Sequence, residues 1–155
     1  MVAGSVTMRR ATDADLPAIV AMLADDQLGG AREDASTPLD PGYVAAFAAI
    51  DADPNQLLAV AELDSKIVGT LQLSYLPGLS FRGAWRGQIE AVRVATALRG
   101  HGIGAQMIDW AVGQCRDRGC RMVQLTSNLT RTDAHRFYER LGWDKSHAGF
   151  KLHLR

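Results

Sequence analysis

The sequence predicts an α/β (α+β) fold in which helices flank a mixed, mostly antiparallel central sheet. Two strand-like stretches in the middle of the chain are joined by a short polar turn, which indicates an antiparallel hairpin. Later segments alternate between strand and helix periodicity, which indicates crossover connections. The chain has 155 residues, of which 47% are hydrophobic and 22% charged, so we expect a single globular domain over residues 1–155.

The first half of the chain is expected to contain a strand, two helices and the central hairpin. Thr12 and Asp15 are typical N-cap and N3 residues of a helix. A proline directly after Asp40 is typical of the first turn of a second helix. The expected elements are a strand at 6–10, a helix from 12 to 23, a polar loop at 25–38, a helix from 40 to 53, and strands at 57–63 and 67–76.

The second half is expected to alternate strands and helices. Gly119 and Gly142 each follow a helical pattern, where glycine commonly ends a helix. The expected elements are a loop at 77–86, a strand at 88–94, a helix from 103 to 118, a strand at 121–126, a short helix that begins at 130 or 132, and a closing hairpin of 143–145 with 149–154.

A glycine-rich turn lies between the strand at 88–94 and the helix that follows it. Its sequence runs from Arg99 to Gly104 and has glycine at every second position, including Gly100 and Gly102. Such a turn leaves backbone N–H groups unpaired at the positive end of a helix, where they can bind a phosphate or pyrophosphate. The alternative interpretation is a tight turn without a ligand, because glycine punctuates turns in many proteins.

Composition and charge exclude several classes of protein. The chain has 17 basic and 17 acidic residues, so its formal net charge is zero and we expect no nucleic-acid partner. It has no apolar run long enough for a membrane span and no signal-peptide pattern, so we expect a cytoplasmic protein. Cys115 and Cys120 fit neither a zinc site nor a disulfide framework, and His135 and His147 have no second ligand at metal spacing. We therefore expect reduced cysteines and no metal.

Two motifs resemble those of the GCN5-related N-acetyltransferase (GNAT) family. The strand segment Val92–Val94 followed by Arg99–Gly104 resembles its acetyl-CoA motif, in which Arg or Gln is followed by two residues, Gly, one residue, and Gly or Ala. The later run from Asn128 contains Phe137-Tyr138 and Leu141-Gly142-Trp143, and it resembles the second signature of the family. The expected order of strands and helices also fits, so the resemblance covers essentially the whole chain.

The resemblance implies acetyl-CoA as the cosubstrate, bound in a GNAT-like splayed cleft. The fourth strand, through Val92 and Val94, would diverge from the fifth strand, through Gln124 and Thr126. The pantetheine arm would lie in the gap and pair with the backbone of the fourth strand, as an added strand would. The amide of Val94 would donate to the thioester carbonyl, where negative charge develops. The implied cofactor-binding residues are Val92, Val94, Arg99, Gly100, Gly102, Ile103, Gly104 and Asn128.

Two residues are candidates for the chemistry of transfer. Tyr138 matches the usual general acid of the family and would protonate the departing thiolate; the alternative is a packing role beside Phe137. Glu90 lies four residues before Val94, and this even spacing predicts that both side chains share one face of the sheet. Glu90 would accept the proton of the amine, through water, or would bind the substrate ammonium or a neighbouring arginine instead.

The loop after the first helix is expected on the acceptor side. Asp26 and Glu33 are its candidate substrate-binding residues, because carboxylates there would attract a cationic amine. The alternative is a solvated loop whose charges have no partner. No motif in this loop or in 77–87 names the acceptor.

The leading function is transfer of an acetyl group from acetyl-CoA to a small-molecule primary amine or amino acid, directly within a ternary complex. Protein N-termini or lysines are the alternative acceptors, and an acyl-CoA-binding sensor without turnover is the alternative function. A nucleotide-dependent oxidoreductase fits less well, because residues 120–127 contain no acidic residue to hold a ribose. Trp143, Phe150 and the closing hairpin could supply a homodimer interface.

Overall fold

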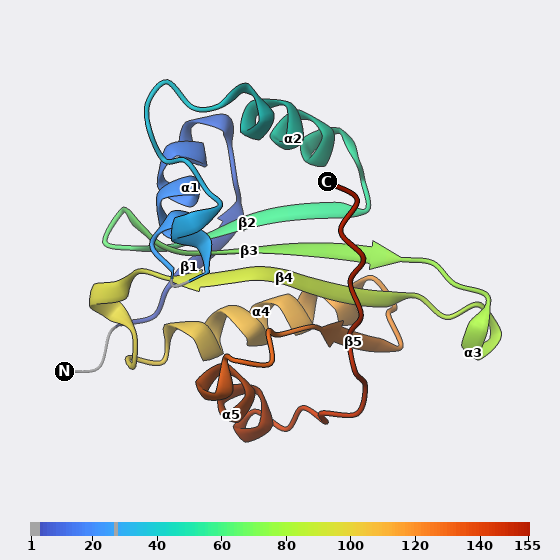
Figure 1. The fold of residues 1–155 in the computed structure, drawn as a ribbon. Coiled ribbons are helices and arrows are strands. Elements are labelled where there is room, and N and C mark those ends of the chain that lie inside the picture. The colour runs from blue at the N-terminus through green and yellow to red at the C-terminus, as the bar shows by residue number, and fades with distance from the viewer. Residues whose placement is uncertain (1–3, 27) are drawn as a thin grey trace. The chain divides into compact units, whose positions relative to one another are not determined.

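The computed structural model describes residues 4–26 and 28–155 (Figure 1). The chain divides into two compact units, of which the first ends at Gln124 and the second begins at Leu125. The helices and strands of the first unit are β1 (Thr7–Arg10), η1 (Asp13–Asp15), α1 (Leu16–Ala24), η2 (Gly29–Ala31), α2 (Pro41–Ala52), β2 (Gln56–Leu63), β3 (Lys66–Leu76), the short turn α3 (Ser80–Gly83), β4 (Arg86–Val94), η3 (Thr96–Leu98) and α4 (Ile103–Asp117). The last strand of the sheet, β5, spans Met122–Leu125, and the second unit contains α5 (Thr132–Arg140).

The five strands form one mixed sheet in the order β1-β2-β3-β4-β5. Strands β1 to β4 are antiparallel neighbours, and Asp64 and Ser65 form the two-residue turn between β2 and β3. The N–H of Arg121 donates to the carbonyl of Trp85 at 2.8 Å, and the residues that follow them form β5 and β4. Both strands continue in the same direction from this contact, so β5 runs parallel to β4. The predicted α+β class with a mixed, mostly antiparallel sheet is confirmed.

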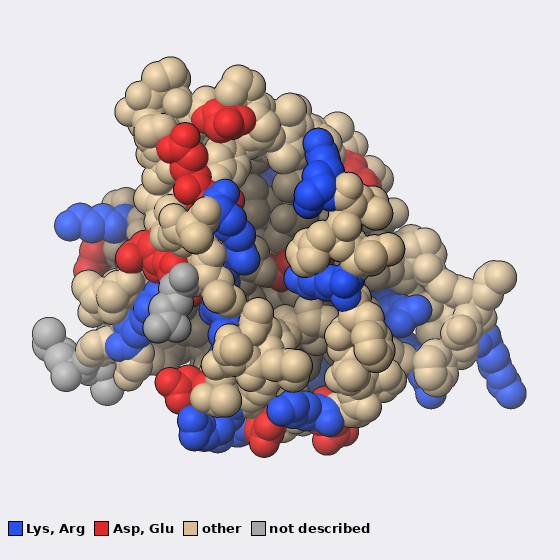
Figure 2. Space-filling view, viewed as in Figure 1, with Lys and Arg blue, Asp and Glu red and all other residues tan. Residues whose placement is uncertain are grey.

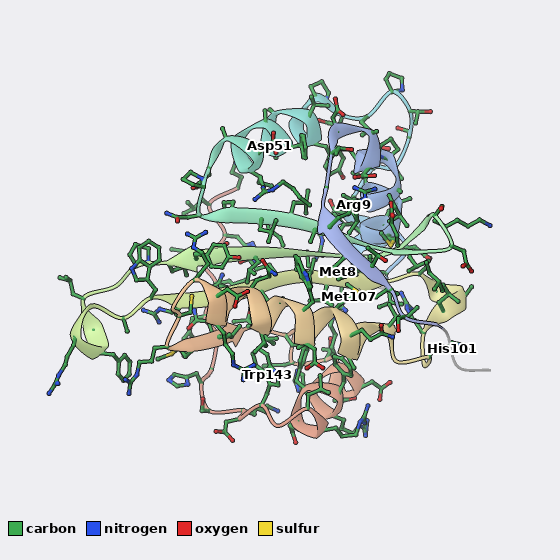
Figure 3. The ribbon with its side chains drawn as sticks, turned by 180° about the vertical axis from the view of Figure 1, so that it is seen from behind. Met8, Arg9, Asp51, His101, Met107 and Trp143 are labelled. Carbon is green, nitrogen blue, oxygen red and sulfur yellow. The ribbon has the colours of Figure 1, made fainter. Side chains whose placement is uncertain are left out.

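Helices cover both faces of the sheet within the first unit. Figure 1 shows α1 and α2 on one face and α4 on the other. The core under α1 and α2 consists of Ala11, Ile19, Leu58 and Val60, with Leu23, Phe47, Ile50 and Ile67 packed against it. The buried residues of α4 are Ile103, Met107, Ile108, Ala111 and Cys115. Met107 lies under the sheet in Figure 3, and a Cβ at Gly69 of β3 would come within 2.5 Å of its sulfur.

Strand β4 contains a β-bulge in its second half. Gln72 of β3 pairs with Glu90, but Gly69 pairs with Val94, so β4 has one more residue than β3 over this interval. Ala91 has a φ of +53°, a left-handed conformation that a residue with a side chain rarely adopts. A bulge inverts the alternation of side chains between the two faces beyond it. The residues before and after Ala91 must therefore be assigned to faces separately.

A charged network ties β1 to the start of α1. The Arg9 guanidinium contacts Asp15 at 2.6 Å and Glu62 at 2.7 Å, and Figure 3 shows Arg9 at the β1 end of the sheet. The Asp15 carboxylate also accepts from the N–H of Thr12 at 2.7 Å, which confirms the predicted helix start. The hydrogen bond from Arg9 lowers the pKa of Asp15 from 3.8 to about 2.

We expect this network to make stability acid-sensitive. Because the folded pKa of Asp15 is below its ordinary value, its contribution is complete above about pH 4 and is lost as the pH falls toward 2. The contribution is about 1–2 kcal/mol after allowance for solvent screening at the partly exposed Arg9. Urea unfolding of wild type and Asp15→Asn from pH 7 to pH 2.5 measures it. The two proteins should differ at pH 7 and converge at low pH; a constant difference would contradict the assignment.

The second unit, residues 125–155, contains one helix among the described residues. Helix α5 is where the sequence predicts it, and Gly142 follows it with a φ of +90°. The predicted closing hairpin is wrong, because residues 143–155 contain no strand. Phe150, Leu152 and Leu154 alternate with polar residues as a strand would, yet their exposed fractions are 95%, 86% and 89%. Alternation specifies two faces, but a strand also requires a partner for its backbone, which the pattern does not supply.

Candidate active site

The edge of β4 that faces away from β3 is the first part of the candidate site. Strand β4 spans Arg86–Val94, whereas its parallel neighbour β5 spans only Met122–Leu125. The N–H of Ala95 donates to Val68 on β3 at 2.8 Å. Because hydrogen-bonded and non-hydrogen-bonded pairs alternate in antiparallel strands, the next pair, Val94 and Gly69, directs its backbone groups outward. The N–H of Val94 therefore faces the edge where an extended ligand could pair with β4.

Because of the bulge, the side chain of Glu90 lies on a different face of the sheet from that of Val94, contrary to the prediction. The sequence spacing places Glu90 and Val94 on one face of the sheet, and this prediction is wrong. Glu90 pairs with Gln72 and Val94 pairs with Gly69, and those two partners lie on opposite faces of β3 because three positions separate them. Glu90 thus shares the face covered by α1 and α2. It is exposed, and its carboxylate accepts from the Gln88 side chain at 2.6 Å.

The glycine-rich turn leads directly into α4. Gly100 and Gly102 have φ angles of +82° and +83°, and Gly102 is the N-cap of the helix that begins at Ile103. Apart from its chain neighbours, no atom of the described residues lies within 4 Å of a Cβ built on either glycine. The first N–H groups of a helix have no partner inside the helix. Those of Ile103 and Gly104 lie directly after this turn, at the positive end of a four-turn helix, which suits an anion.

The loop after α1 contacts the segment that joins β4 to this turn. Asp26 forms an ion pair with Arg93 at 3.4 Å, and these side chains are only 10% and 11% exposed. The Asp25 carboxylate accepts from the Thr96 hydroxyl at 2.6 Å, and its carbonyl accepts from the Arg99 guanidinium at 3.4 Å. The sequence predicts Asp26 as a ligand of the substrate ammonium. In this structure its carboxylate is already engaged by an arginine.

A small apolar pocket lies on the same sheet face as Glu90. It has a volume of about 150 Å³, and its lining comes mainly from α1 and α2. Gln72, the cross-strand partner of Glu90, is its polar residue on β3. Tyr43 also lines it and donates a hydrogen bond to Glu33 at 3.0 Å. The structure therefore connects Glu33 by a hydrogen bond to Tyr43, a lining residue of this pocket that the sequence analysis missed.

The second unit contains the other two predicted site residues. Tyr138 of α5 makes edge-to-face contacts with Phe137 and Trp143, at centroid distances of 5.0 and 5.8 Å. The Asn128 side-chain oxygen accepts from the N–H and hydroxyl of Thr130, at 2.9 and 2.7 Å. These bonds fix the turn before α5 and use the carbonyl end of the amide. The NH₂ end of Asn128 is the donor that a pantetheine carbonyl would require.

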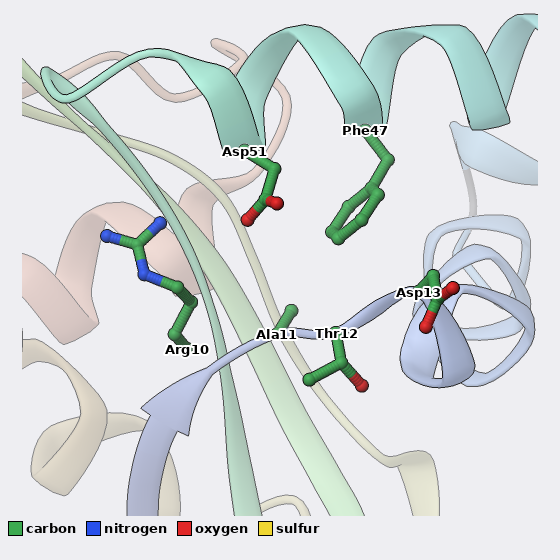
Figure 4. Close-up of a pocket in the computed structure, with 6 residues that line it drawn as sticks. All are labelled: Arg10, Ala11, Thr12, Asp13, Phe47 and Asp51. Carbon is green, nitrogen blue, oxygen red and sulfur yellow. The ribbon is translucent and has the colours of Figure 1, made fainter.

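A larger hollow of about 410 Å³ lies elsewhere in the first unit. It is lined by Arg10, Phe47 and Asp51 together with residues 11–13, and Figure 4 shows the side chains of Arg10 and Asp51 directed into it. None of the predicted site residues lines it. It lies at the β1 edge of the sheet, and β1 is separated from β4 by β2 and β3.

Other kinds of site find little support in the described residues. Cys115 is buried, and burial raises the pKa of its thiol to about 12, which favours the protonated form. Among residues 4–26 and 28–155, no group of three or more His, Cys, Asp or Glu could hold a metal ion. No helix in that part of the chain is long and apolar enough to span a membrane. Figure 2 shows acidic and basic side chains interspersed over the visible face.

Comparison with known proteins identifies the family to which the chain belongs. The model of the acetyltransferase (GNAT) family matches residues 21–143, which include β4, the glycine-rich turn and α5. The chain therefore belongs to the GNAT acetyltransferase family. The resemblance seen in the two sequence motifs is confirmed.

Three named proteins are similar to this chain. An aminoalkylphosphonate N-acetyltransferase from Salmonella typhimurium is 36% identical over 104 residues, which are 67% of each chain. A crystal structure of a transcriptional regulator from Bacillus halodurans is 48% identical with a TM-score of 0.94, and the match covers 97% of this chain and all of that one. A Trypanosoma brucei acetyltransferase is 26% identical with a TM-score of 0.77, over 97% and 100% of the two chains.

Proposed function

We propose that this protein transfers an acetyl group from acetyl-CoA to a small-molecule primary amine, directly within a ternary complex. Both units would act together as one acetyltransferase domain. The observation that carries the proposal is the outward-facing backbone at the end of β4, followed by a glycine-rich turn at the start of α4. An extended pantetheine arm would pair with the outward-facing backbone, and a pyrophosphate would bind at the glycine-rich turn.

The cofactor would lie along Val92 and Val94, with its pyrophosphate on the backbone amides from Arg99 to Gly104. The N–H of Val94 would donate to the thioester oxygen as the amine attacks the carbonyl carbon. Negative charge builds on that oxygen and then passes to the departing sulfur. Tyr138 would give the thiolate its proton, and Asn128 would hold the pantetheine arm.

The amine would approach from the face that carries Glu90. On that face the pocket beside Gln72 could receive a compact apolar group of the acceptor, and its lining residue Tyr43 donates a hydrogen bond to Glu33. Glu90 would either take the proton of the ammonium, through water, or hold the ammonium by charge. The relationship to an aminoalkylphosphonate N-acetyltransferase supports a small amine as the acceptor class.

Acetylation of a panel of amines tests the proposal. Purified protein and acetyl-CoA are incubated with aminoalkylphosphonates, amino acids, polyamines and a lysine-containing peptide, and free CoA is measured. We expect release above the no-acceptor rate with at least one small amine. Release with the peptide alone would replace the proposed acceptor class by a protein.

A second candidate function is an acyl-CoA-responsive regulator without turnover. Its support is the 48% identity with a Bacillus protein that is named a transcriptional regulator. The two functions differ in a simple way: a sensor binds acetyl-CoA but releases no CoA with any amine of the panel.

A further inference from the structure

We propose that Asp25 and Asp26 are positioning residues that hold the cofactor-binding segment 92–99, and that Asp26 acts through Arg93 and does not bind the amine. This inference rests on the proposed function, because it assigns a role toward acetyl-CoA. The two carboxylates and their partners are called the acidic clamp below.

The acidic clamp links one loop to three points on the cofactor segment. Arg93, Thr96 and Arg99 are spaced by three residues each, and all three contact Asp25 or Asp26. These three residues lie between the bulge and Gly100. They therefore span the connection between β4, which would hold the pantetheine arm, and the glycine-rich turn, which would hold the pyrophosphate. A shift of this connection would change the distance between the pantetheine site and the pyrophosphate site.

Arg93 connects the clamp to the strand backbone. One nitrogen of its guanidinium contacts Asp26 at 3.4 Å, and another donates to the carbonyl of Val92 at 2.8 Å. Val92 is one of the residues expected to pair with pantetheine. Arg99 acts in the same way, because its side chain donates both to the carbonyl of Val94 at 3.3 Å and to that of Asp25. Each arginine thus joins the acidic loop to a carbonyl of the outward-facing edge.

Burial distinguishes this arrangement from a solvated acidic loop. The Asp26 and Arg93 side chains are about one-tenth exposed, and Asp26 also accepts from the N–H of Gly29 at 3.3 Å. Gly29 is itself buried, and a Cβ there would lie 1.9 Å from the carbonyl of Leu23. The loop is therefore packed tightly against the end of α1. An amine would have to displace Arg93 from a largely desolvated pair before it could reach Asp26.

The acidic clamp and a substrate-binding role predict opposite effects of Asp26→Asn. If the clamp holds the cofactor segment, the substitution raises the Kd of acetyl-CoA by roughly tenfold or more, since small misplacements of a binding group have effects of that size. The KM of the amine at saturating acetyl-CoA stays within about twofold of wild type. If Asp26 binds the ammonium, the KM of the amine rises and the Kd of acetyl-CoA is unchanged.

Calorimetric titration with acetyl-CoA tests this on wild type, Asp26→Asn, Arg93→Gln and the double variant, well below their unfolding temperatures. Asp34→Asn is the matched control, because Asp34 lies in the same stretch, is exposed and contacts Ser36. We expect weaker binding in both single variants, no further loss in the double variant, and unchanged binding in the control.

Each other outcome has a distinct meaning. Wild-type affinity in Asp26→Asn, or additive losses in the double variant, would overturn the acidic clamp and leave the proposed function intact. Loss of binding in Asp34→Asn would also overturn it, because any change in the loop would then suffice. Failure of the wild-type protein to bind acetyl-CoA would overturn the proposed function and the clamp with it.

Discussion

Replacement of Tyr138 by phenylalanine should lower kcat by about a hundredfold and leave the Kd of acetyl-CoA unchanged. The substitution removes only the phenolic hydroxyl, so the ring can keep its contacts with Phe137 and Trp143. Loss of a general acid costs about 10²–10⁴-fold in rate, because the thiolate then leaves without a positioned proton. Steady-state kinetics with the best acceptor of the amine panel measures the effect.

The control for this variant is Tyr75→Phe. Tyr75 is 4% exposed on the α4 face of β3, with the Arg118 guanidinium 4.0 Å from its ring centre. It has no proposed role in transfer, so its variant should keep the wild-type kcat. A kcat unchanged in Tyr138→Phe would show that the hydroxyl does not act as the acid, and Tyr138 would then be a packing residue of α5.

Replacement of Gly102 by alanine should weaken acetyl-CoA binding by about tenfold or more. A Cβ at this position meets no atom within 4 Å in the part of the chain that the structure describes, but it would occupy the space through which the pyrophosphate would reach the backbone amides. Loss of a single hydrogen bond to a charged group costs about 1.5–3 kcal/mol, which corresponds to at least tenfold in Kd. Calorimetric titration with acetyl-CoA gives the value.

Gly119→Ala separates this effect from backbone strain. Gly119 follows the other end of α4 and has a φ of +75°, and among residues 4–26 and 28–155 no atom beyond its chain neighbours lies within 4 Å of a built Cβ. Both variants should therefore lose about 1–2 kcal/mol of stability, since each places a side chain in the left-handed region. Only Gly102→Ala should lose affinity. Equal affinities in the two variants would mean that the glycine-rich turn is merely structural.

The order of elements could be predicted from the sequence because each long element has a clear period. Thr12, Asp15, Gly119 and Gly142 predict helix boundaries that the structure confirms. These signals are local, so they do not depend on which segment packs against which. The predicted closing hairpin is wrong because its alternating pattern is local, whereas the stability of a strand depends on a partner strand elsewhere in the chain.

The β4 bulge is a site feature that the sequence pattern does not predict. The pattern of residues 88–94 indicates a continuous strand, and a regular strand puts Glu90 and Val94 on one face. The signal that could have revealed the bulge is the odd interval between the apolar residues Ile89 and Val92. Two residues that face the same core across an odd interval require an inserted residue, which the structure shows near Ala91. Asp26 and Arg93 lie 67 positions apart in the sequence, and no sequence pattern indicates that they form a pair.

Calorimetric titration of the wild-type protein with acetyl-CoA, with NADH as the control ligand, tests the central claim most directly. The outward-facing end of β4 and the turn from Arg99 to Gly104 predict micromolar binding of acetyl-CoA and no binding of NADH. No heat with acetyl-CoA, from protein that circular dichroism shows to be folded, would contradict the claim that this edge and this turn form a cofactor site.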